Sequence, residues 1–209
     1  VHDGRSYYSL TEKAMRLGPL KQIEDLADGL DRLVGDDSVK KKVVEGIEQI
    51  TATSSDSEIA EWYKGAMARL DALVDERTRN LIMQNCGYYG CASANRGYIE
   101  EAIARRKKYR SIDEFLEAEI QGGGIAREGG TLYQTYTPRK SGMRCYCSLV
   151  RSLPANETIS PTYCQCAAGL VKKYWEDVLE RPVKVELVHS SMSGAQECKF
   201  AIYLQWLAL

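Results

Sequence analysis

The stretch SPTYCQCAAGLVKKYWEDVLERPVKVELVHS, residues 160–190, holds a helix and a strand in direct succession. Ser160 is a favoured N-cap residue, and Pro161 suits the first position of a helix. Apolar residues then recur every three or four positions, and after Pro182 every second residue is apolar, which predicts an amphipathic helix followed by a strand. The helix should therefore lay its apolar side on a sheet. That side comprises Tyr163, Cys166, Ala167, Leu170, Tyr174 and Val178.

Three further strands are predicted on either side of this stretch. Apolar and polar residues alternate in TLYQTYT (131–137), MRCYCSLV (143–150) and CKFAIYLQW (198–206). The first two should form a hairpin through residues 138–142, because Pro138 and Gly142 are turn residues. Residues 125–209 are thus predicted to form a mostly antiparallel sheet covered by one helix.

Residues 1–124 are predicted to be helical. Amphipathic patterns cover residues 10–33 and 39–50, and Ser55 with Glu58 makes a capping box that opens the longest helix. That helix should end near Asn85, because two glycines follow in NCGYYGC. Further helices are expected over residues 98–109 and after Ser111. The fold class is therefore α+β, with both parts in one globular unit.

Composition excludes several classes of function. The 209 residues can bury a core without disulfides, and 28 Lys and Arg against 29 Asp and Glu leave no field for nucleic acid or anionic membrane. No run of about eighteen apolar residues occurs, and the start VHDGRSYYSL lacks the regions of a signal peptide. We expect a cytoplasmic protein without nucleic-acid or membrane partners. A homodimer stays open, since no heptad pattern demands one.

Seven cysteines are an odd number, which favours buried thiols or a metal site over a closed set of disulfides. Strand alternation turns the thiols of residues 143–150 towards the covering helix, and the last two strands should place a histidine and a cysteine on the same face. We therefore predict a small-molecule site, a mostly apolar pocket between sheet and helix. Its predicted lining is Cys145, Cys147, Tyr163, Cys166, His189 and Cys198.

A zinc ion is the first alternative. Cys145, Cys147, Cys164 and Cys166 form two CxC pairs, and thiolates are good zinc ligands. The spacing is awkward, however. Two residues on one face of a strand lie roughly 6.6 Å apart, and positions two apart in a helix diverge by about 200°. Thiols beside the two glycines of NCGYYGC could add ligands, so the cofactor is open, with zinc as the metal that would fit.

Cysteine catalysis is the second alternative. A helix N-terminus lowers the pKa of a thiol, which makes Cys164 or Cys166 the natural nucleophile. His189 is the histidine that could assist as a base. Such a pair would make the protein a hydrolase of a small heterocyclic or amide substrate.

The region from Tyr163 to Leu204 resembles the end of a 4-vinyl reductase type ligand-binding domain. The resemblance is carried by Gly169, by the strand that ends at Ser190, and by Gly194 followed by Cys198 and Phe200. Domains of this type are similar to transport-complex subunits of the TRAPP kind and to sensor domains of aromatic-hydrocarbon regulators. The resemblance implies a sheet and a helix that enclose an apolar cavity for a small ligand.

Some members of that family bind zinc through a glutamate and two cysteines. When these positions are carried over from Cys198, the other two fall on Leu187 and Ser190, so two ligands of that site are absent. The chain also resembles, more loosely, bacterial proteins labelled as L-2-amino-thiazoline-4-carboxylic acid hydrolases. That resemblance implies the hydrolase alternative without assigning a catalytic residue.

Overall fold

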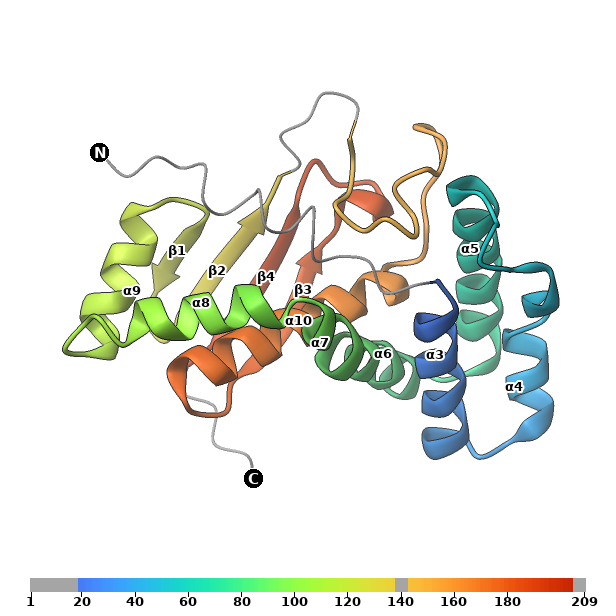
Figure 1. Ribbon diagram of the computed structural model, residues 1–209, viewed down its shortest axis with the longest axis horizontal. Coiled ribbons are helices and arrows are strands. Elements are labelled where there is room, and N and C mark those ends of the chain that lie inside the picture. Colours follow the sequence, from blue (N-terminus) through green and yellow to red (C-terminus); the bar gives the residue numbers. More distant parts are fainter. Residues whose placement is uncertain (1–18, 138–142, 205–209) are drawn as a thin grey trace.

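A computed structural model describes residues 19–137 and 143–204 and shows an α+β fold (Figure 1). Helices fill the first part of the chain, and a four-stranded sheet with one long helix fills the second, which confirms the predicted fold class. No helix among the described residues is both long and apolar enough to span a membrane. The first part contains α3 (Pro19–Leu33), α4 (Asp37–Val43), η1 (Ile47–Gln49), α5 (Asp56–Leu73), α6 (Glu76–Asn85), η2 (Cys86–Cys91), α7 (Ala92–Ala94), α8 (Arg96–Arg106) and α9 (Ile112–Gln121). The second contains β1 (Ile125–Glu128), β2 (Thr131–Tyr136), α10 (Pro161–Leu179), β3 (Lys184–His189), η3 (Ser191–Ser193) and β4 (Cys198–Tyr203).

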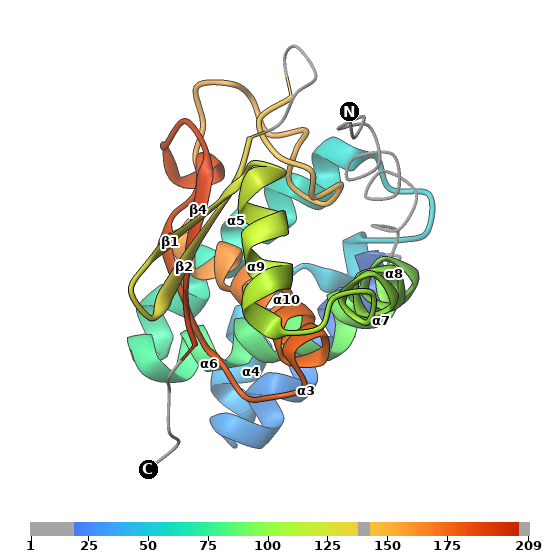
Figure 2. The ribbon, with the colours of Figure 1, turned by 90° about the vertical axis from the view of Figure 1, so that its left-hand side faces the viewer.

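The sheet is antiparallel throughout, in the order β1-β2-β4-β3. Leu132 and Val185 both pair with Ile202, so apolar side chains line up across three strands on one face. Seen nearly edge on in Figure 2, the sheet has α9 and α10 on the same side. The opposite face carries polar and aromatic contacts, such as Lys199 over the ring of Tyr133. Strand alternation therefore predicted the buried face of β3 and β4 correctly.

Helix α10 begins and packs as its sequence predicts. The Ser160 hydroxyl accepts a hydrogen bond from the backbone N–H of Thr162, and Pro161 occupies the first turn. Trp175 is fully buried against the sheet, where its indole N–H donates to the Gln134 side chain at 2.8 Å. The helix ends at Glu180, which has a positive φ of 53°.

Two hydrophobic cores meet along α10. The first lies among α3, α5 and α6, and it receives Leu149, Tyr163 and Cys164 from the second part of the chain. The second lies between the sheet and helices α8, α9 and α10. The first turns of α10 therefore belong to a different core from the rest of that helix.

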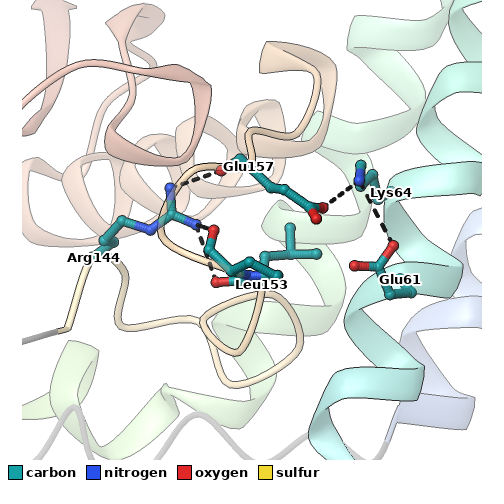
Figure 3. Close-up of polar contacts among 6 residues, drawn as sticks. Glu61, Lys64, Arg144, Leu153 and Glu157 are labelled. Carbon is teal, nitrogen blue, oxygen red and sulfur yellow. Dashed lines mark hydrogen bonds and ion pairs between the residues drawn. The ribbon is translucent and has the colours of Figure 1, made fainter.

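The predicted strand over residues 143–150 is wrong. This segment is irregular, and β2 pairs with β1 and β4 instead, so both edges of β2 are occupied. Arg144 holds the segment in place, since its guanidinium donates to the carbonyls of Leu153, Pro154 and Glu157 at 3.2, 2.8 and 2.7 Å (Figure 3). The Glu157 carboxylate in turn pairs with Lys64 of α5. The predicted turn at residues 138–142 lies outside the described residues.

The helical part differs from prediction at three places. The capping box of Ser55 and Glu58 is confirmed, but α5 ends at Leu73, and Asp75 caps a new helix by accepting from Thr78 N–H at 3.0 Å. The helix predicted over residues 39–50 stops at α4, because Gly46 adopts a φ of 80°. Of the pattern over residues 10–33, positions 10–18 lie outside the described residues.

The glycines of NCGYYGC do not end a helix, which corrects the third prediction. Residues Cys86–Cys91 continue from α6 as one π-helical segment, η2, that leads into α7. Gly87 and Gly169 are needed for the packing of the two helices. A Cβ added to Gly87 would lie 1.8 Å from the carbonyl oxygen of Cys166, and one added to Gly169 would lie 1.9 Å from that of Gln84. Backbones of the α6–η2 helix and α10 are therefore in direct contact.

Candidate functional site: a thiol cluster at the start of α10

All seven cysteines are free thiols, and the residues around the first two turns of α10 bring them into one neighbourhood. Two contacts define its centre. The sulfurs of Cys91 and Cys166 lie 3.1 Å apart, and the sulfur of Cys147 lies 3.2 Å from the hydroxyl of Tyr163. Residues from η2, from the irregular segment 143–150 and from α10 therefore meet here.

The CxC pair of α10 splits the thiols into two groups. Cys164 hydrogen bonds with Ser190 and Ser193, whereas Cys166 points to Cys91 of η2, as the divergence of helix positions two apart requires. We call the thiols around Cys91 the Cys91 group and those near the serines the Cys198 group. Cys86, Cys91 and Cys166 belong to the Cys91 group, and Cys164 and Cys198 belong to the Cys198 group. Cys145 and Cys147 lie between the two groups.

Cys164 and Cys166, the two predicted nucleophiles, have raised pKa values and are protonated at neutral pH, which gives no support to an activated thiolate at either position. Burial raises the pKa of Cys86 and of Cys164 to about 12, although hydrogen bonds with Ser190 and Ser193 partly oppose the shift at Cys164. The contact with Cys91, followed by burial, raises the pKa of Cys166 well above its usual range. Burial at Cys164, and the contact with Cys91 together with burial at Cys166, therefore outweigh any effect of the helix N-terminus on these two thiols.

Three thiols combine accessible surface with a desolvated position. Cys145, Cys147 and Cys166 are only half-buried. Yet burial is the main cause of the raised pKa of Cys145 and Cys147, and for Cys166 it comes second only to the contact with Cys91. These three thiols therefore form a partly accessible surface beside the first core.

Aromatic residues form the wall behind this surface. The rings of Tyr63 and Tyr163 meet edge to face, with centroids 5.4 Å apart. Burial, followed by the proximity of Cys147, raises the pKa of both phenols well above the usual value, so they are neutral. Polar side chains lie at the edges of the cluster, such as Gln22 at Cys91 and Ser191 at Cys198.

His189 and Cys198 lie at the side of the cluster nearest the sheet. The imidazole Nε2 of His189 is 3.9 Å from the Glu197 carboxylate, and no hydrogen bond joins this histidine to a thiol in the described part of the chain. Cys198 contacts Ser191, whose backbone N–H and hydroxyl both lie 3.4 Å from its sulfur. A β-bulge after Leu187 changes the register at this end of β3. The structure thus gives no support to a pair of His189 with Cys164 or Cys166.

The predicted zinc ligands do not form a metal site in this geometry. Within residues 19–137 and 143–204, no group of three Cys, His, Asp or Glu side chains is arranged to hold a metal ion. Cys164 and Cys166 point to different groups, as described above. The donor geometry therefore does not support the set Cys145, Cys147, Cys164 and Cys166 as zinc ligands.

Sequence reasoning missed several residues of the cluster. Gln22 donates a hydrogen bond to the Cys91 sulfur at 3.1 Å, and Tyr63 packs on Tyr163, but both are ordinary members of helix patterns. Nothing in their local sequence separates them from other core or surface positions. Only the crossing of α10 with the α6–η2 helix brings them to the thiols.

Comparison with known proteins gives one match. The sequence profile of a family described as a family of unknown function (DUF6144) matches residues 30–207. No curated protein and no solved structure matches the chain. The resemblance of residues 163–204 to 4-vinyl reductase type domains stays a prediction.

Proposed function

This chain belongs to DUF6144, a family whose function is unknown, and from the geometry of its thiols we propose that it binds a small, mostly apolar molecule at the partly accessible surface formed by Cys145, Cys147 and Cys166. The observation that carries the proposal is the combination of accessible surface with desolvation at these three thiols. Binding sites for small molecules are concave, and a few polar groups in mostly apolar walls orient the ligand.

The lining favours a neutral ligand. Thiols and phenols that stay protonated cannot balance the charge of a buried ion. Burying an unpaired ion costs on the order of several kcal/mol or more. Sulfur atoms and aromatic rings make favourable contacts with each other. An uncharged aromatic or heterocyclic compound therefore fits the walls made by Tyr163 and the thiols.

The two alternatives receive less support. A cysteine-dependent hydrolase needs an ionised thiol near neutral pH, and burial raises the pKa of Cys164 to about 12. A structural zinc would need the two CxC pairs to converge on one ion, and Cys164 and Cys166 diverge. A cytoplasmic location, which we also propose, suits a protein with seven free thiols.

Titration with Nile red, a neutral aromatic dye whose fluorescence rises in apolar surroundings, tests the proposal. We expect saturable binding, and we expect Cys147→Phe, which places a ring on the partly accessible surface, to weaken it by about tenfold or more, the factor that corresponds to about 1.4 kcal/mol. The matched control is Cys86→Ala, because Cys86 is buried in the first core. Binding that does not saturate, or that is equal in the two variants, would contradict the proposal.

A further inference from the structure

We propose that Cys91 and Cys166 form a redox site in which a peroxide converts the two thiols into a disulfide between η2 and α10. The inference does not rest on the proposed ligand, since it concerns only the two sulfurs and the backbone that holds them. It would make the crossing of η2 and α10 a place of reversible covalent modification.

The distance between the two sulfurs is the first argument. They lie 3.1 Å apart, and a disulfide bond is about 2.05 Å long, so about 1 Å of movement closes it. Rotation of two side chains supplies a movement of that size.

The backbone around the pair is the second argument. Gly87 of η2 and Gly169 of α10 allow the two helices to touch, with Cys166 at the point of contact. Because main-chain atoms meet there, the positions of Cys91 and Cys166 are fixed by packing. The two thiols are therefore presented to each other by rigid elements.

Hydrogen bonds distinguish the two sulfurs. The sulfur of Cys91 accepts from the side-chain amide of Gln22 at 3.1 Å, and it also lies 3.1 Å from the sulfur of Cys166. The amide donor is the contact that distinguishes Cys91 from Cys166. Cys91 is also half-buried, so a small oxidant in solution can reach it. The geometry assigns the attacking role to Cys91 and the resolving role to Cys166.

The chemistry balances in two steps. The Cys91 thiolate attacks one oxygen of hydrogen peroxide, the O–O bond breaks, and with one proton taken up the products are a sulfenic acid and water. The Cys166 sulfur then attacks the sulfenic sulfur, the S–O bond breaks, and the thiol proton leaves with the hydroxide as a second water. Two thiols and one peroxide thus give one disulfide and two waters, and an external dithiol reverses the reaction.

Other thiols of the cluster have different nearest partners. Cys147 contacts the Tyr163 hydroxyl, and Cys198 contacts Ser191. Cys164 hydrogen bonds with Ser190 and Ser193. Oxidation should therefore be selective for a single pair among the seven cysteines.

The experiment treats the full-length reduced protein with a few equivalents of hydrogen peroxide, blocks remaining thiols with a maleimide, and maps disulfides by mass spectrometry after non-reducing digestion. We expect one disulfide, between Cys91 and Cys166, that dithiothreitol removes. Because the map is made on the wild-type chain, it does not depend on whether a variant folds. No disulfide, or a dominant disulfide between other cysteines, would overturn the proposal.

Three variants test the roles. Cys166→Ser should leave a sulfenic acid on Cys91 that dimedone captures, whereas Cys91→Ser should yield neither a disulfide nor captured sulfenic acid at Cys166. Cys198→Ser is the matched control, since it removes a half-buried thiol outside the pair and should form the disulfide as wild type does. Loss of the disulfide in Cys198→Ser, or oxidation of Cys166 at the wild-type rate in Cys91→Ser, would refute the assignment.

Discussion

Gly87 and Gly169 hold equivalent positions on the two helices that cross beneath the thiol cluster. A Cβ on Gly87 would overlap the carbonyl of Cys166, and a Cβ on Gly169 would overlap the carbonyl of Gln84, each three residues before the opposite glycine. The contact is therefore close to symmetric, and it involves main-chain atoms that cannot be moved by a change of rotamer. This crossing sets where every thiol on η2 and α10 lies.

Alanine at either glycine should destabilise the protein. Overpacking costs about 1–3 kcal/mol or more, and here the obstacle is backbone. Urea denaturation of Gly87→Ala and Gly169→Ala measures the loss in the free energy of unfolding. Gly97→Ala is the matched control, because nothing lies within 4 Å of its added Cβ in α8. It should be neutral or stabilise by ~0.5–1 kcal/mol. Equal effects at all three positions would contradict the close crossing.

Alkaline pH should destabilise the fold through the buried thiols. In the folded protein the pKa of Cys86 and Cys164 is about 12, against 9.0 for a free thiol. Between these values the unfolded chain loses protons that the folded chain keeps, so stability present below pH 9 declines by about 1.4 kcal/mol per pH unit for each thiol. Denaturation measured across this range should show a smaller slope in Cys164→Ala. An unchanged slope would mean that Cys164 ionises freely in the folded protein.

Removal of the Arg144 side chain should expose the thiols of the segment that it holds. Arg144→Ala eliminates three hydrogen bonds to the carbonyls of residues 153–157 (Figure 3), so local opening should increase and maleimide labelling of Cys145 and Cys147 should accelerate ~10-fold or more. Arg151→Ala is the control, since that residue is exposed on the same segment. Peptide mapping of labelled sites gives the rates. Similar labelling rates in both variants would argue that Arg144 does not hold this segment in place.

The hydroxyl of Tyr163 should control the reactivity of Cys147. It lies 3.2 Å from the Cys147 sulfur, and the hydrogen bond between them opposes the rise in the pKa of that thiol caused by burial. Tyr163→Phe removes this hydrogen bond, so labelling of Cys147 should slow by about 3- to 10-fold. Tyr146→Phe removes a hydroxyl that donates to the Thr137 carbonyl and should leave the rate unchanged. Faster labelling in Tyr163→Phe would show that the ring, and not the hydrogen bond, limits access.

Much of the fold could be predicted because local signals and burial agree. Ser55, Ser111 and Ser160 all cap helices as expected, and alternation found β2, β3 and β4. Strand β1 was missed because IARE has no alternation and only Ile125 is partly buried. Residues 143–150 alternate without being a strand, since pairing with a neighbour, and not alternation, makes a strand. The cap at Asp75 was readable from its spacing to Thr78.

The site was less predictable, because its thiols come from elements that local patterns do not relate. The predicted positions of Cys145 and Cys147 relied on a strand over residues 143–150 that does not form. Most of the thiols lie beside the first core and not on the face of the sheet. Gly87 lies in a sequence that predicts the end of a helix, but in the structure it allows a close helix crossing. That crossing depends on Gly169, which lies 82 positions away in the sequence. The raised pKa of Cys164 likewise follows from tertiary burial, which no spacing reveals.

The π-helical form of η2 has a consequence for the length of this segment. A π-helix turns by less than the roughly 100° per residue of an α-helix, so η2 accommodates one residue more than an α-helix would, and the residues after it keep their orientation. Deleting one position, such as the exposed Tyr89, would restore α-helical geometry and leave Cys91 facing Cys166. A homologue one residue shorter in this segment would therefore keep the dithiol, although the spacing of its cysteines would differ.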